Sequence, residues 1–199
     1  TAAKLNNDII SGSTELASEP ADTDEFLVSD AGTLKRIDYS LIKGGGITVA
    51  DQYRLTTSFT GTSQDITSNL ERVDTTGQGF IGSVTESSGI FSFSETGVYL
   101  IQFGMNFNNA STADNVTGGI RLTTDNSDYN NYGLEAQNNA MGQGQGQAGS
   151  FFGQTLFDVT NVSTHKCKFY AGSLLSSTTV VGNTNTNNTY MTFIRLGDT

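Results

Sequence analysis

Short alternating runs of apolar and polar residues, separated by turn-rich loops, recur along most of the chain. Every second residue from Val98 to Phe107 is large and apolar, a period that is typical of a β-strand with one buried face. Comparable runs bounded by Gly, Ser, Thr and Asn predict a series of short strands, which favours an antiparallel sandwich or barrel. Their expected ranges are Gln52–Phe59, Gly79–Val84, Gly89–Ser94, Val98–Phe107, Gly118–Thr124, Phe151–Val159, Cys167–Ala171 and Tyr190–Leu196.

The stretch SGIFSFSETGVYLIQFGMNF at Ser88–Phe107 is the most apolar part of the sequence. The turn residues of Ser94–Gly97 separate its two strands. We therefore interpret it as a hairpin at the centre of the core. Its expected core residues are Phe91, Phe93, Tyr99, Ile101, Phe103, Met105 and Phe107.

Two other strands are apolar on both faces. Tyr190 and Ile194 alternate with Met191 and Phe193, and the run Phe151–Val159 shows the same pattern. A sandwich sheet needs only one apolar face for its own core, so the second face predicts contact with another subunit. Loops folded over this face are the alternative. The predicted interface residues are Phe151, Phe152, Tyr190, Phe193 and Ile194.

The first 43 residues differ from the rest and end in KGGG at Lys43–Gly46. Such a glycine run predicts a flexible joint at 44–46, between an N-terminal arm at 1–43 and a main domain at 47–199. Two alternating runs around Asp30-Ala31-Gly32 predict a hairpin with a three-residue turn. A two-stranded ribbon is marginally stable alone, so we expect it to attach to a partner surface. The expected attachment residues are Phe26, Val28, Leu34, Ile37 and Tyr39.

Composition and charge narrow the classes of partner. The chain of 199 residues has a formal net charge of −10, and its stretch from Leu122 to His165 contains no Lys or Arg. Binding to a phosphate backbone needs clustered cations, so we expect no nucleic-acid partner. The single cysteine permits no internal disulfide. No apolar stretch approaches the length of a membrane span, so we expect no membrane insertion.

Few residues in the chain are suited to catalysis. His165 lies in a predicted turn, where we expect an exposed and inert imidazole, whereas Cys167 begins an apolar strand and is expected to be buried. We therefore predict no catalytic residues and no enzyme activity. A carbohydrate-active enzyme is the alternative, because paired carboxylates can converge only in three dimensions.

Two loop features have oxygen and aromatic groups suited to binding. Asp125, Asn126 and Asp128 in TTDNSDY are candidate calcium ligands, although the segment lacks the terminal glutamate of a calcium loop, and a solvated turn is the alternative. No other metal or cofactor is expected. The nearby Tyr129, Asn130, Asn131 and Tyr132 combine amphipathic rings with adaptable amides, which favours a receptor-contact loop or a plain soluble connection.

The order of three segments resembles a known family. GIFSFSETGVYLIQFGMNF, FDVTNVSTHKCKFYAG and YMTFIRLG, with Gly97-Val98-Tyr99 and Phe193, resemble the C1q and tumour necrosis factor-like jelly roll over about residues 47–199. This resemblance implies an all-β, antiparallel jelly-roll sandwich and a homotrimer packed through the sheet that holds the terminal strand. The chain has no collagen repeat or secretory signal, so the resemblance does not imply secreted signalling.

The front segment PADTDEFLVSDAGTLKRIDYSLIKG resembles one that recurs in structural proteins of tailed, especially marine, bacteriophages. The two resemblances together imply a virion surface protein that is made in the bacterial cytoplasm and held on other virion proteins by its N-terminal arm. One expected form is a capsid decoration or short head fibre. The other is the receptor-binding tip of a tail fibre, which would recognise a host surface glycan or protein.

Overall fold

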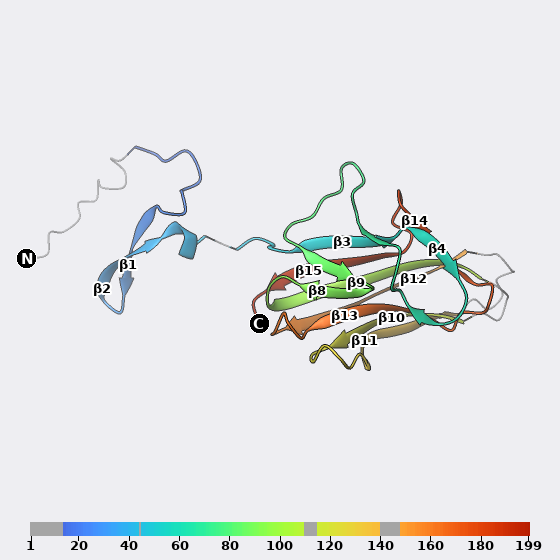
Figure 1. Ribbon diagram of the computed structural model, residues 1–199. Coiled ribbons are helices and arrows are strands. Elements are labelled where there is room, and N and C mark those ends of the chain that lie inside the picture. Colours follow the sequence, from blue (N-terminus) through green and yellow to red (C-terminus); the bar gives the residue numbers. More distant parts are fainter. Residues whose placement is uncertain (1–13, 44, 110–114, 140–147) are drawn as a thin grey trace, which may run out of the picture. The chain divides into compact units, whose positions relative to one another are not determined.

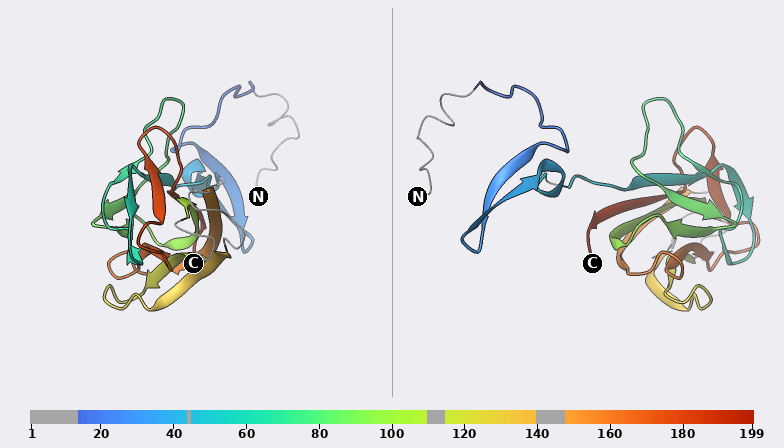
Figure 2. Two further views of the ribbon diagram at one scale, coloured as in Figure 1. Left: turned by 90° about the vertical axis from the view of Figure 1, so that its right-hand side faces the viewer. Right: turned by 60° about the vertical axis from the view of Figure 1, so that its left-hand side comes forward.

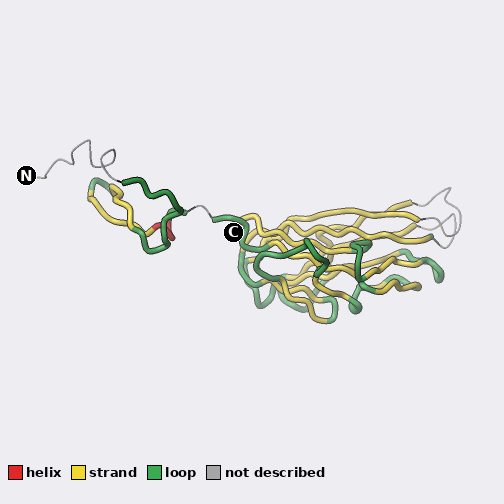
Figure 3. The backbone as a smooth tube through the Cα atoms, turned by 90° about the horizontal axis from the view of Figure 1, so that it is seen from above, coloured by secondary structure: helices red, strands yellow, loops and turns green. Residues whose placement is uncertain are grey.

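The computed structural model describes residues 14–43, 45–109, 115–139 and 148–199. The chain divides between Gly46 and Ile47 into two compact units, here called the ribbon unit and the sandwich unit. Strands make up nearly all of the regular structure, and the one helical segment in these ranges is a short 3-10 turn at Tyr39–Leu41 (Figure 3). The predicted all-β class is confirmed. Within the described ranges, no helix has the length and hydropathy to cross a membrane.

The ribbon unit contains one antiparallel hairpin, formed by β1 (Glu25–Asp30) and β2 (Thr33–Asp38). Asp30 pairs with Thr33, so the turn has two residues instead of the predicted three. Ala31 and Gly32 both have positive φ angles, of 47° and 84°. Two consecutive residues with positive φ are typical of the tight hairpin turns whose twist matches that of the strands.

The sandwich unit has two antiparallel sheets that face each other (Figures 1 and 2). The seven-stranded sheet contains β3 (Ala50–Leu55), β4 (Thr57–Thr60), β6 (Leu70–Arg72), β9 (Gly97–Asn108), β12 (Ala148–Val159), β14 (Thr179–Asn183) and β15 (Tyr190–Gly197). The six-stranded sheet contains β5 (Gln64–Asp65), β7 (Val84–Ser87), β8 (Ile90–Phe93), β10 (Asn115–Thr123), β11 (Asn131–Asn139) and β13 (Lys166–Gly172).

Strand β9 organises the seven-stranded sheet. It pairs with β12 along its whole length on one side, and with β15 and then β14 on the other. Strand β15 in turn pairs with β3, which pairs with β6. The two strands with apolar residues on both faces, β12 and β15, therefore lie on either side of β9.

The core lies between the two sheets and is rich in aromatic residues. All seven residues expected there from the Ser88–Phe107 pattern are buried, which confirms that prediction. Phe169 of β13 makes edge contacts with Phe91 and with Phe193, and its ring centroid lies 5.2 Å from that of Phe103 across the sandwich. Such offset and edge-on contacts add to the stabilisation that comes from burial alone.

The predicted hairpin between β8 and β9 is wrong. Strand β8 pairs with β7 and β13, whereas β9 belongs to the opposite sheet, so the residues between them cross from one sheet to the other. Gly97 begins β9 with a φ of 143°, and a Cβ there would lie 2.5 Å from the carbonyl oxygen of Gly197. This crossing therefore requires glycine.

Several other strand predictions also need correction. The predicted strand ranges leave out Asn131–Asn139 and Thr179–Asn183, where the structure has strands β11 and β14. The expected strand at Gly79–Val84 is reduced to a single bridge between Ile81 and Ala50 before β7 begins. The polar runs at 108–115 and 141–150, whose composition predicts loops, lie largely outside the described residues.

Candidate self-association site

Alternation along four neighbouring strands creates a surface that points away from the core, here called the outer face. Side chains one residue out of phase with the core point outward from β12, β9, β15 and β3. The outer face consists of Phe152, Gln154 and Leu156 on β12, Leu100 and Gln102 on β9, Tyr190, Thr192 and Ile194 on β15, and Ala50 and Gln52 on β3.

The strand register sorts these side chains into rows. Leu156 pairs with Leu100, Leu100 with Ile194, and Ile194 with Ala50, which makes an apolar row across four strands. One step along the same face, the row is Gln154, Gln102, Thr192 and Gln52. The next row contains Phe152, Gly104 and Tyr190 and ends at Arg54. The polar row thus lies between an apolar row and a row that holds two aromatic rings.

Several side-chain amide and hydroxyl groups of the polar row are already hydrogen-bonded within the chain. Gln102 Nε2 donates to Gln154 Oε1 at 3.2 Å, and Gln52 Nε2 donates to Thr192 Oγ1 at 2.7 Å. Asn187 Nδ2 donates to Gln52 Oε1 at 2.6 Å. Because buried polar groups cost little when they are paired, this row can be covered by another protein surface.

One side of the outer face protrudes. Phe152 is 57% exposed and Leu156 is 61% exposed. Both lie on β12, which pairs only with β9 among the described residues. An edge strand with large exposed apolar side chains is a liability for a soluble monomer and is typical of an interaction surface.

The other side of the outer face is hollowed. A cavity of about 280 Å³ lies between strands β3 and β15 and the loop at Gln78–Gly79. Ala50, Gln52, Thr192 and Ile194 line its floor. The protruding edge and the hollow thus lie at opposite ends of the same four-strand surface.

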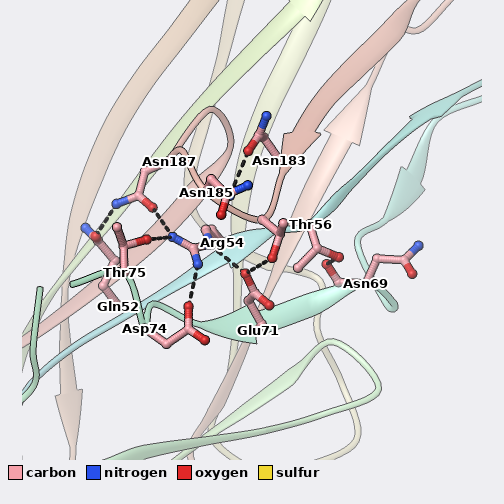
Figure 4. Close-up of polar contacts among 11 residues, drawn as sticks. Gln52, Arg54, Thr56, Asn69, Glu71, Asp74, Thr75, Asn183, Asn185 and Asn187 are labelled. Atoms are coloured by element: carbon pink, nitrogen blue, oxygen red, sulfur yellow. Dashed lines mark hydrogen bonds and ion pairs between the residues drawn. The ribbon is translucent and has the colours of Figure 1, made fainter.

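Beside the hollow, the buried Arg54 holds two loops onto β3 (Figure 4). Its side chain is 1% exposed. Its Nε donates to Glu71 Oε1 at 2.7 Å, its Nη2 donates to Asp74 Oδ1 at 2.6 Å, and its Nη1 donates to Thr75 Oγ1 at 2.7 Å and Asn187 Oδ1 at 3.5 Å. These partners fix the border of the outer face. The alternation of apolar and polar residues did not predict that they contact Arg54.

Glu71 makes this border sensitive to acid. Partial burial would raise the pKa of its carboxyl, but hydrogen bonds from Arg54 and Thr184 and the charge of Arg54 outweigh this effect and lower it. A carboxylate with a lowered pKa stabilises the folded state above its ordinary pKa, and the contribution is lost as the pH falls through the lowered value.

We therefore expect the sandwich unit to lose stability as the pH falls below the ordinary value of 4.5, and Glu71→Gln to lose less than the wild type. Thermal melting at a series of pH values would measure this difference. Glu135→Gln removes the same charge from the exposed side of β11 and should melt like the wild type across the series. Parallel curves for Glu71→Gln and the wild type would contradict the assigned role.

A second buried ion pair lies on the inner side of β3. Asp51 accepts hydrogen bonds from Arg72 Nη2 at 3.0 Å and from the Val84 backbone N–H at 2.8 Å. The Arg72 guanidinium lies 4.4 Å from the centre of the exposed Phe80 ring. This pair ties β3 to β6 and to the start of β7.

The structure places the five predicted interface residues on two different faces. Phe152, Tyr190 and Ile194 belong to the outer face. Phe151 and Phe193 are buried in the core of the single chain, so their assignment to an interface is wrong. Phe151 directly precedes Phe152, and Phe193 directly precedes Ile194. Because neighbours in a strand point to opposite sides, both phenylalanines point into the core.

The candidate calcium ligands serve the turn between β10 and β11. Asp125 Oδ1 accepts hydrogen bonds from the backbone N–H groups of Ser127 and Asp128, each at 2.9 Å, and these bonds hold the pKa of Asp125 well below its usual range. Asp128 Oδ1 caps the Asn130 N–H, and Asn126 has a φ of 61°. In the described ranges, no three His, Cys, Asp or Glu side chains group as metal ligands.

His165 and Cys167 are both held away from solvent. The prediction of an exposed imidazole is wrong, because His165 is 8% exposed, stacks on Phe157 and contacts the hydroxyls of Thr160 and Thr164. Cys167 is buried as predicted, and burial raises the pKa of its thiol. A protonated thiol in the core is a poor nucleophile.

The predicted receptor-contact residues lie on the opposite sheet from the outer face. Tyr129 and Asn130 end the turn that Asp125 caps, whereas Asn131 and Tyr132 begin β11. The two asparagines and Tyr132 are exposed. The ring of Tyr129 lies over the ammonium group of Lys168.

In the ribbon unit, no side chain of residues 14–43 is fully buried. The expected attachment residues Phe26, Val28 and Ile37 share one face of the hairpin, and the Tyr39 ring lies 6.0 Å from that of Phe26. Leu34 lies on the other face, beside the exposed Leu27. Both faces of this ribbon are therefore partly apolar and lack a core.

No protein-family model matches the sequence, and no curated protein matches it. Solved structures do match. Eiger TNF from S. frugiperda is 11% identical, with 77% of this chain and 96% of that chain covered and a TM-score of 0.59. Murine APRIL at pH 5.0 is 9% identical, with coverages of 74% and 98% and a TM-score of 0.53.

The globular domain of zebrafish complement 1qA protein is 12% identical, with 76% of this chain and 99% of that domain covered and a TM-score of 0.50. At these identities the similarity shows the fold. The sandwich unit is an antiparallel jelly roll of the kind found in TNF and C1q domains, as its sequence predicts.

Proposed function

We propose that the chain is a non-enzymatic structural protein that associates with copies of itself through the outer face and forms a homotrimer. The observation that carries this proposal is the asymmetry of the outer face. Phe152 and Leu156 protrude at one end, and the cavity between β3, β15 and Gln78–Gly79 lies at the other. When the edge of one copy meets the hollow of the next, the contact is head-to-tail and closes into a ring.

The number of copies comes from the family resemblance. The C1q and TNF-like jelly rolls that the sequence resembles are usually homotrimers, and the sandwich unit has that fold. The outer face includes β15, the strand through which the resemblance implies that subunits pack. Mass measurement by light scattering tests the proposal, with an expected value of three times the 21.1 kDa of one chain. A value near 21.1 kDa at micromolar concentration would exclude it.

We further propose that the protein belongs to the surface of a tailed phage particle, as a capsid decoration or short head fibre. Support comes from the resemblance of residues 20–44 to phage structural proteins, and from the hairpin of the ribbon unit, which has apolar residues on both faces and no fully buried side chain over residues 14–43. Disulfides are rare in proteins of the bacterial cytoplasm, and a chain with one cysteine forms no internal disulfide, so the chain suits synthesis there. Immunogold labelling of intact particles tests this assignment, since label on the tail tip would favour a receptor-binding tip instead.

The paired change Leu27→Ser and Leu34→Ser should weaken attachment strongly and leave the sandwich unit folded. Both leucines are exposed on one face of the ribbon, so their loss removes apolar contact area without disturbing a core. Co-sedimentation with particles that lack the protein would measure binding. We expect at least a tenfold reduction, since burial of two leucines contributes about 3 kcal/mol or more.

Leu175→Ser is the matched control, because Leu175 is an exposed leucine of the sandwich unit. It should bind particles like the wild type. Equal co-sedimentation of the paired ribbon variant and this control would contradict an anchoring role for the ribbon.

A further inference from the structure

Three tyrosines gather with two cations on the exposed side of the six-stranded sheet, away from the outer face. This group, here called the tyrosine cluster, draws on β5, β10, β13, the turn after β10, and β11. Its members are Tyr129, Tyr132, Tyr170, Arg121, Lys168 and Asp65.

The cluster is held together by charge and ring contacts. The Arg121 guanidinium carbon lies 4.1 Å from the centre of the Tyr170 ring and 5.1 Å from that of Tyr132. Arg121 Nη1 also forms an ion pair with Asp65 Oδ1 at 2.9 Å. Lys168 Nζ lies 4.1 Å from the centre of the Tyr129 ring. Contacts of this kind are strongest when partly desolvated, and the side chains of Arg121 and Lys168 are both mostly buried.

The neighbouring turn is also fixed before any partner arrives. Asp125 accepts two backbone hydrogen bonds, and Asp128 accepts the Asn130 N–H at 2.8 Å. Asn130 is therefore held at a set position in the turn next to β11, the strand that carries Tyr132. A surface that is ordered in advance loses little conformational entropy on binding.

The accessible part of the cluster presents a ring and amide groups. Tyr132 is 43% exposed, although Arg121 lies near one part of its ring, and Asn130 is exposed. A flat ring offers contact to the C–H groups of a sugar, and an amide can both donate to and accept from sugar hydroxyls. In addition, Arg121 Nε and the Tyr129 hydroxyl have no hydrogen-bond partner in the described part of the chain. Both atoms are buried, so they belong to the support of the cluster and not to its accessible part.

The charges favour a neutral ligand. Asp65 lies within ion-pair distance of both Arg121 and Lys168, so the cations are already matched in part. The chain also carries a net charge of −10, which repels anions. We propose that the tyrosine cluster is a binding site for a neutral saccharide, which stacks on Tyr132 and is hydrogen-bonded by Asn130.

Affinity electrophoresis of the full chain in gels that contain mannan, dextran, amylose or dextran sulfate tests this proposal. We expect at least one of the three neutral polysaccharides to retard the protein. Tyr132→Ala should weaken that binding by about tenfold or more, because it removes the ring on which the sugar stacks; tenfold in affinity corresponds to about 1.4 kcal/mol. Tyr132→Phe keeps the ring and should bind within about twofold of the wild type.

Phe80→Ala is the matched control. Phe80 also has an exposed ring beside an arginine, but it is not part of the tyrosine cluster. It should bind like the wild type. Three results would overturn the proposal: no retardation by any neutral polysaccharide, retardation by dextran sulfate alone, or equal binding by Tyr132→Ala. The cluster and the outer face lie on different sheets, so light scattering on the same variants separates a failure of this site from a failure of assembly.

Discussion

Ile194→Asp should convert the assembled protein into folded single chains. Ile194 lies in the apolar row of the outer face between Leu100 and Ala50, and its side chain is only half-buried in one chain. A carboxylate there stays hydrated in the monomer but would be buried without a partner charge in an assembly. Light scattering should then give 21.1 kDa, with a circular dichroism spectrum like that of the wild type.

The control for this change is Leu175→Asp. It places the same charge at an exposed leucine in the loop between β13 and β14, outside the outer face. This variant should keep the assembled mass. If Ile194→Asp also kept that mass, the outer face would not be the contact between copies.

Phe193→Asp, one residue earlier, should prevent the sandwich unit from folding. Phe193 is 0% exposed and its ring centroid lies 5.1 Å from that of Phe91. Loss of a core phenylalanine costs about 3–5 kcal/mol, and an unpaired buried carboxylate adds several more. Since domains of this size are stable by about 5–15 kcal/mol, the sum removes most or all of the stability.

Circular dichroism and hydrogen exchange would show whether Phe193→Asp is folded. The milder variant Phe193→Ala should still fold, so its free energy of unfolding can be measured. That free energy should be about 3–5 kcal/mol lower than in the wild type. A folded, monomeric Phe193→Asp would instead place Phe193 at the contact between copies, as the sequence pattern alone had indicated.

The contrast between Phe193 and Ile194 also shows how far the sequence alone could go. Alternation identified both strands with two apolar faces and the seven core residues of Ser88–Phe107, because a period of two is a local property. It could not decide which face was inside, since Phe193 and Ile194 are both apolar. The answer depends on which strands lie across the sandwich, and only the fold supplies that.

Strand pairing was predicted less well for the same reason. The chain between β8 and β9 has turn residues that also fit a hairpin, and nothing local shows that it crosses to the other sheet. Strand β11 has a polar sequence with Leu134 and Ala136 as its apolar contacts to the core, so its pattern is that of a loop. The partners of Arg54 come from positions 71 to 187 and leave no local pattern.

The central place of β15 has a consequence for synthesis. This strand pairs with β9 on one side and β3 on the other, so the sheet has a gap in its middle until residues 190–197 have left the ribosome. A chain cut short before Tyr190 lacks both that central strand and the outer-face residues on it. We therefore expect truncated products to be excluded from assemblies that form through the outer face.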